Sequence, residues 1–183
     1  MLKDRVNGLV FPVIILLAAA GPGHLSVAAD ELRQTRALPL SLAQQAATAA
    51  VAQCRQDGYR VSAAVVDRGG NVQALLRADG AGPHTPDSSR KKAYTAASLG
   101  RSTRELAQLI VKIPSIQALR DMNENILILG GGLPIKIGGE VVGGIGVGGA
   151  PGDRFDEACA RKGLETIKAS LDKPADQGLS GTR

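Results

Sequence analysis

The chain has 183 residues, a net charge of +5, two tyrosines, two phenylalanines and no tryptophan. The chain is only mildly basic and has neither clustered basic arms nor stacking aromatics. Its composition therefore argues against a nucleic-acid-binding protein. The core must be built from Ala, Val, Ile and Leu, and oligomerisation would help to stabilise so light a core.

The first 29 residues have the three-part pattern of a secretory signal peptide. Lys3 and Arg5 precede an apolar run, and small residues precede Asp30. The run is about a dozen residues long, shorter than the roughly 20 that span a bilayer, so an uncleaved membrane anchor is disfavoured. We predict cleavage near Ala29, a flexible segment over 30–37, and a periplasmic or secreted protein.

A helix and a β-hairpin are predicted next. Ser41 and Gln44 have the spacing of a capping box at the start of an Ala-rich helix, which Gly58 ends. Apolar residues alternate over 60–66, and a returning strand is expected over 72–77. Asp, Gly and Asn residues between the two strands favour a tight turn.

Two further helices are predicted after a turn-rich loop over 78–86. Asp87 or Ser88 can cap the first of them. Ser102 opens a second capping box, and Pro114 breaks the helix that follows it.

The rest of the chain predicts a second hairpin and a last helix. Hairpins separated by helices favour an α+β domain with a mainly antiparallel sheet. The expected elements are a short helical segment over 116–122, strands over 126–129, 133–137 and 140–147, a helix from a cap at Asp153 to Leu171, and a disordered tail over 172–183.

The two cysteines, Cys54 and Cys159, allow two interpretations. In an oxidising compartment they could form a disulfide. Free cysteines are also common as small buried side chains on helices, and we favour this second interpretation.

The glycine-rich run near the C-terminus formally matches the G-x-G-x-x-G nucleotide-binding pattern over 144–149. Such a site needs a βαβ unit and an acidic residue on a second strand, and only one helix is predicted after this run. We therefore expect the glycines to allow close backbone approach to a neighbouring element or a ligand. No nucleophile elbow, zinc-ligand spacing or distinct pair of catalytic carboxylates is recognisable.

The loop over 78–86 and the helix after it concentrate polar chemistry in an otherwise aliphatic chain. Taken singly, each polar side chain in this region could be an ordinary solvent-exposed residue or a residue packed in the core. Together they form a candidate site for an anionic, partly apolar ligand, because the cations could pair with carboxylates. The candidate binding residues are Arg77, His84, Arg90, Lys91, Tyr94 and Thr95.

Several short motifs occur in order along one domain over residues 38–171. They are AVVDRGG (64–70), RADGA (77–81), KAYTA (92–96), GGLPI (131–135), and VGGIGVGGAPG (142–152) followed by DEACA (156–160). With these landmarks the chain resembles the GlcG/HbpS-like family of heme-binding and heme-degrading proteins, which includes the C-terminal domain of PduO-type proteins.

The resemblance implies a profilin-like, layered α/β/α domain with an antiparallel sheet of about five strands. It also implies a symmetric homo-oligomer, with heme or a related tetrapyrrole as ligand. Secreted members are linked to heme capture, heme degradation and redox sensing through a membrane sensor partner. In the family fold the first and last helices would pack side by side, which would bring Cys54 and Cys159 near bridging distance.

His84 is our candidate iron ligand, chosen for its chemistry rather than from the family. Tyr94, Thr95 and Met122 are the next candidates. Because the chain has no C-x-x-C-H sequence, bound heme would be non-covalent. We expect a binding protein, although heme breakdown is an open alternative. A second alternative is an enzyme for another small anion, and a third is an oligomeric accessory protein with incidental heme affinity.

Overall fold

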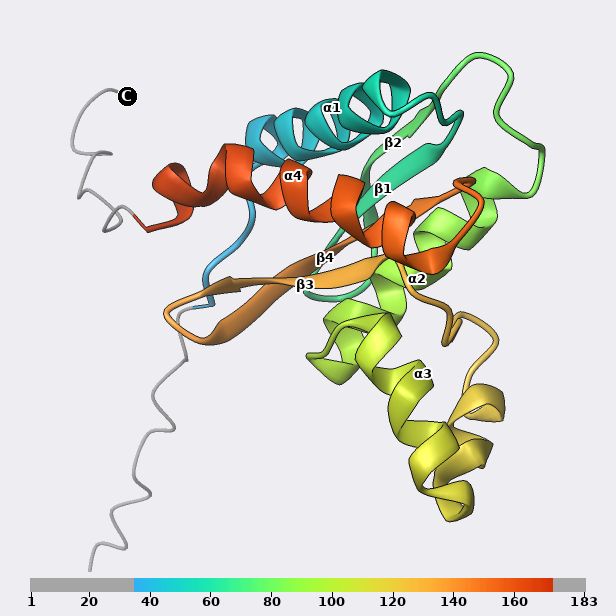
Figure 1. Ribbon diagram of the computed structural model, residues 1–183. Coiled ribbons are helices and arrows are strands. Elements are labelled where there is room, and N and C mark those ends of the chain that lie inside the picture. The colour runs from blue at the N-terminus through green and yellow to red at the C-terminus, as the bar shows by residue number, and fades with distance from the viewer. Residues whose placement is uncertain (1–34, 173–183) are drawn as a thin grey trace, which may run out of the picture. The chain divides into compact units, whose positions relative to one another are not determined.

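The computed structural model describes residues 35–172 (Figure 1). The predicted signal peptide, the start of the segment 30–37 and nearly all of the predicted tail lie outside these residues. Within 35–172, no helix combines the length and apolarity needed to cross a bilayer. The elements are α1 (Leu40–Gln56), β1 (Ser62–Asp67), β2 (Val72–Arg77), α2 (Thr85–Leu99), α3 (Thr103–Lys112), the 3₁₀ helix η1 (Pro114–Asp121), β3 (Gly132–Ile137), β4 (Glu140–Gly148) and α4 (Asp153–Leu171).

The described residues form one antiparallel sheet with the strand order β2-β1-β4-β3. The two predicted hairpins are its two halves, and β1 joins β4 at the centre. The expected strand over 126–129 is absent from this part of the chain, so the sheet has four strands rather than about five. Instead of joining the sheet, the Leu127 N–H donates to Oγ1 of Thr95 at 2.8 Å.

Helices cover both faces of the sheet, which confirms the α/β/α layering and the α+β class. In Figure 1, α1 and α4 lie along one face, and α2 lies behind the sheet. Successive side chains of β1 point alternately to these two faces. Ala63 and Val65 join the core beneath α1 and α4, whereas Ala64 and Val66 pack with Ala93 of α2.

Three of the predicted helix caps are wrong. α1 begins one residue before Ser41, and the Pro39 carbonyl accepts from the first turn. α2 begins at Thr85 because Pro86 suits the first turn of a helix. Asp153 is the first residue of α4 rather than its cap. The Ser102 cap is confirmed, since its Oγ accepts from two backbone N–H groups of α3.

The glycine-rich run is strand β4, and its glycines let α2 approach the sheet. A Cβ on Gly146 would lie 2.1 Å from the Ser89 carbonyl oxygen, and one on Gly144 would lie 2.3 Å from that of Ala93. Side chains at these positions would therefore push α2 off the sheet. The expectation of close backbone approach is confirmed, and the neighbouring element is α2.

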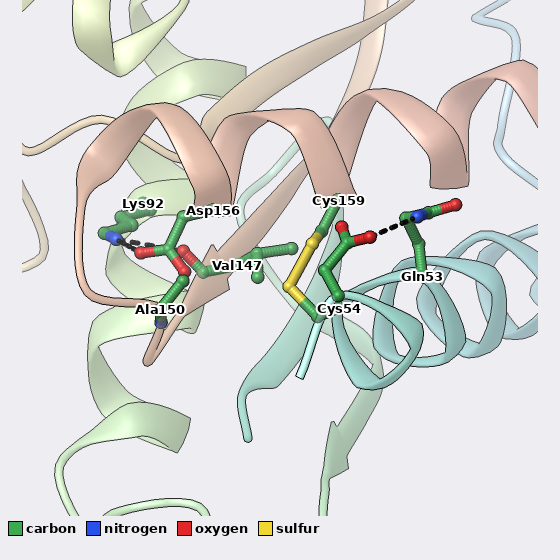
Figure 2. Close-up of a disulfide and its surroundings, with 8 residues drawn as sticks. Gln53, Cys54, Lys92, Val147, Ala150, Asp156 and Cys159 are labelled. Atoms are coloured by element: carbon green, nitrogen blue, oxygen red, sulfur yellow. Dashed lines mark hydrogen bonds and ion pairs between the residues drawn. A yellow bond between two sulfur atoms is a disulfide. The ribbon is translucent and has the colours of Figure 1, made fainter. Parts of the chain in front are cut away.

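Cys54 and Cys159 form a disulfide between α1 and α4, with their Cα atoms 5.5 Å apart (Figure 2). Both side chains are buried in the core between these helices and the sheet. The favoured interpretation of two unbridged cysteines is therefore wrong. That interpretation rested on the residues around each cysteine, whereas the side-by-side packing of the first and last helices that the family resemblance implied is confirmed.

Candidate functional site

The predicted binding residues begin on either side of the loop between β2 and α2. Arg77 is the last residue of β2, and its guanidinium donates to the Ala81 carbonyl at 3.0 and 2.5 Å. His84 directly precedes α2 and is exposed. Its ring lies against Gly82, where a Cβ would be 2.7 Å from Cε1 of His84. Glycine at this position thus lets the imidazole fold back over the loop.

Arg90 and Lys91 lie in the first turns of α2, and both bind Asp87. The Arg90 and Lys91 cations lie 3.0 and 3.2 Å from the Asp87 carboxylate oxygens. Arg90 also donates to Oδ1 of Asn125 at 2.9 Å. The hydrogen bond from Arg90, aided by Lys91, holds the pKa of Asp87 below its usual range. The charges of Arg90 and Lys91 are therefore partly neutralised by Asp87, which belongs to the same helix.

Tyr94 and Thr95 lie farther along α2 than the loop residues. The Tyr94 ring lies against Gly70 in the β1–β2 turn, at the opposite end of that hairpin from Arg77. Thr95 is fully buried, and its hydroxyl donates to the Lys91 carbonyl while accepting from Leu127 N–H. The structure thus places Arg77 and His84 at the two ends of the β2–α2 loop and Tyr94 at the opposite end of the hairpin.

A polar cleft of about 400 Å³ lies at the Arg77 end of the hairpin. It contains two arginines that the sequence analysis missed, Arg55 at the end of α1 and Arg60 before β1. The Arg60 side chain lies against Gly80 of the same loop that carries His84. The cleft is lined by Val51, Arg55, Tyr59, Arg60, Arg77, Ala78 and Asp79.

Hairpin pairing was the signal that could have revealed Arg60. Because Ser62 pairs with Arg77, residues just before β1 must lie beside residues just after β2. Arg55 had no such signal, since the position of α1 over the sheet depends on tertiary packing.

The electrostatics of this three-arginine cleft favour an anion. Among residues 35–172, none of its three guanidinium groups has a carboxylate within 4.0 Å. Asp79 is the only acidic residue among the described residues that line the cleft. Planar guanidinium groups bind carboxylates and phosphates through two parallel hydrogen bonds. The cleft can therefore hold a ligand that carries one or two such groups.

A buried ion pair lies at the end of β4 and joins α2 to the start of α4 (Figure 2). The Lys92 ammonium is 2.8 Å from Oδ2 of Asp156 and donates to the Val147 carbonyl at 2.9 Å. Oδ1 of Asp156 accepts from Ala150 N–H. Burial raises the pKa of Asp156, while the Lys92 ammonium opposes that shift. All polar atoms of the pair point to protein partners, which indicates a structural role.

A sequence profile and a related protein of known sequence point to the same family. The sequence profile described as "Haem degrading protein HbpS-like" matches residues 38–165. The protein GlcG of Escherichia coli is 31% identical over 117 residues, covering 58% of this chain and 80% of GlcG.

Two crystal structures agree with this assignment. That of HbpS has a TM-score of 0.70 and 44% identity, and the match covers 75% of this chain and 94% of HbpS. That of a PduOC:heme complex has a TM-score of 0.66 and 25% identity, and covers 72% of this chain and 96% of PduOC. The predicted family resemblance is confirmed.

Proposed function

This chain belongs to the HbpS-like family of heme-degrading proteins, and on that basis we propose that it binds heme non-covalently at the loop carrying His84 and the three-arginine cleft. The observation that carries the proposal is the convergence of Arg55, Arg60 and Arg77 beside that loop. The structural similarity to a PduOC:heme complex supports the choice of ligand.

The donor set fits heme. The His84 imidazole is exposed and supplies a nitrogen ligand of the kind that binds heme iron. The three guanidinium groups suit the two propionates. Bound heme would supply the redox chemistry of its iron, while the chain orients the macrocycle and neutralises its carboxylates.

One protomer offers limited cover for the apolar macrocycle. The cleft volume of about 400 Å³ is near the lower end of the roughly 300–1,000 Å³ that is typical of ligand pockets. Its lining is mainly polar, with Val51 and Ala78 as its aliphatic members. These facts support the further proposal of a homo-oligomer in which a second copy covers the exposed side of the ligand.

The proposed location is the periplasm or the exterior. The signal-like N-terminus and the Cys54–Cys159 disulfide support it, because disulfides persist in oxidising compartments. Mass spectrometry of the protein from its native compartment should give Asp30 as the first residue. A retained Met1 in that fraction would contradict the proposal. Within that compartment we place the protein in heme capture, degradation or redox sensing, the last with a membrane sensor partner.

Hemin titration of the mature, oxidised chain tests the function. We expect a defined Soret shift that saturates at one heme per chain or per dimer. The charge-removing variant Arg60→Gln should weaken binding, whereas Lys112→Gln, on α3, should not. A Soret change that never saturates, or that is equal in both variants, would contradict the assigned site.

The polar character of the cleft favours one alternative function. A small anion that carries carboxylates or phosphates would satisfy the three arginines without an apolar slot. An enzyme acting on such an anion would then bind heme only incidentally. A competition titration distinguishes the two functions. If a small anion displaces bound heme at micromolar concentration, the alternative function is favoured.

A further inference from the structure

A second pocket lies on the other half of the sheet, between the edge strand β3 and the C-terminal half of α4. Its volume is about 350 Å³, and it shares no lining residue with the three-arginine cleft. Its lining consists of Leu133, Pro134, Ile135, Lys136, Arg161, Leu164, Glu165, Lys168 and Leu171.

The floor of this β3–α4 pocket is aliphatic, and its rim is cationic. Leu133, Ile135 and Leu171 are buried at the floor, and Leu164 is half-buried. Lys136 and Lys168 are exposed at the rim. In the part of the chain that the structure describes, neither lysine has a carboxylate at ion-pair distance.

The other two charges at the rim have partners of their own. Arg161 binds Glu157 at 2.8 Å, and Glu165 lies 3.9 Å from Lys162. The lysines therefore leave the rim with a positive excess above an apolar floor. That combination complements an amphiphile with a carboxylate head and an aliphatic chain.

The edge strand itself argues against a peptide as the occupant. Among the described residues 35–172, β3 pairs only with β4, and its other edge has no strand partner there. Pro134 stands in the middle of that strand and has no N–H to donate. A proline in an edge strand hinders the addition of another strand, because it cannot donate a backbone hydrogen bond.

We propose that the β3–α4 pocket binds a medium-length aliphatic carboxylate, with the chain over Leu164 and the head group between Lys136 and Lys168. This site is independent of the heme site. The volume of about 350 Å³ and the aliphatic floor suit a single alkyl chain. Exposed lysines contribute little individually, so the apolar chain supplies most of the affinity.

Calorimetric titration of the mature chain with octanoate, decanoate and dodecanoate, each below its micelle concentration, tests this site. Affinity should rise by up to roughly fourfold for each added methylene. Leu164→Glu should abolish binding, whereas Val111→Glu, which alters an exposed apolar residue of α3, should leave it unchanged. Lys168→Ala should weaken binding by up to about fivefold, and its matched control Lys112→Ala, also in the last turn of a helix, should not.

Three results would overturn the proposal. One is affinity that does not depend on chain length, or that is equal in Leu164→Glu and the wild type. Another is dissociation of a wild-type oligomer by Leu164→Glu without ligand, which would assign the pocket to an interface between copies. The third is loss of heme binding in Leu164→Glu, which would make the pocket part of the heme site. Circular dichroism of Leu164→Glu checks its fold, and Lys168→Ala tests the site without altering the core.

Discussion

The Lys92 ammonium and the Asp156 carboxylate lie 2.8 Å apart, with their side chains only 2% and 5% exposed. Lys92 belongs to α2 on one face of the sheet, and Asp156 belongs to the first turn of α4 on the other. Cys159, one turn further along α4, is bonded to α1. The start of α4 is therefore tied to α1 in its own layer and to α2 on the opposite face of the sheet (Figure 2).

Removing one partner of the Lys92–Asp156 pair should destabilise the fold strongly. Asp156→Asn leaves an ammonium group buried without a counter-charge, which should lower the free energy of unfolding by about 3–5 kcal/mol. The apolar double variant Lys92→Met/Asp156→Leu should lose less stability than the sum of the losses caused by the two single substitutions. Urea unfolding measures each value. Lys162→Met, which affects an exposed pair, is the control and should change stability by less than about 1 kcal/mol.

The titration of Asp156 should reflect its burial. Because burial raises its pKa, the carboxyl should titrate above 3.8, and Lys92→Met should raise the midpoint further. The stabilising contribution of such a group is full below its unfolded pKa and is lost as pH rises through the folded pKa. Stability of Lys92→Met should therefore fall more than that of the wild type as pH rises above 3.8. Carboxyl NMR and urea unfolding at several pH values check both results; a wild-type midpoint below 3.8 would contradict them.

The Cys54–Cys159 disulfide closes a sequence separation of 105 residues. Cys54→Ala/Cys159→Ala should lower the free energy of unfolding by roughly 2–5 kcal/mol. Thiol labelling of the oxidised, unfolded wild type should find no reactive thiol, and prior reduction should expose two. Two labelled thiols without reduction would show that the bond does not form.

Close packing of α2 on β4 should make Gly146 intolerant of a side chain. A Cβ there would lie 2.1 Å from the Ser89 carbonyl oxygen and 2.5 Å from the Ala93 nitrogen. Gly146→Ala should therefore lower the melting temperature and cost at least about 1–3 kcal/mol. In Gly152→Ala the new Cβ would make ordinary contact with the Phe155 ring at 3.4 Å, and this control should change stability by about 1 kcal/mol or less.

Substitutions at the heme site should separate iron ligation from propionate binding. His84→Ala should change the visible spectrum and spin state of bound heme, because the iron loses its ligand while the arginines remain. Arg60→Ala or Arg77→Ala should keep the spectrum and lose at most about 1.5–3 kcal/mol of binding free energy. Absorption and electron paramagnetic resonance spectra check the first result, and hemin titration checks the second. An unchanged spectrum and affinity in His84→Ala would exclude His84 as the ligand.

Local patterns predicted most of the elements because periodicity and turn residues act over a few positions. The alternation before Asp67 and the paired glycines at 138–139 were enough to predict both hairpins. The segment 126–129 is apolar enough for a strand, yet Thr95, 32 positions away from Leu127, binds its backbone. Tertiary hydrogen bonding thus overrode local propensity there.

The sequence by itself determined the family, the α+β class and the loop that carries His84, since these follow from residue order and short-range spacing. Only the tertiary structure decided which charges meet. Arg55 joins Arg60 and Arg77 because α1 packs over the hairpin. Lys92 meets Asp156 across 64 positions because the glycines of β4 let α2 sit close to the sheet. Contacts between distant residues depend on how the layers pack, and no local pattern contains that information.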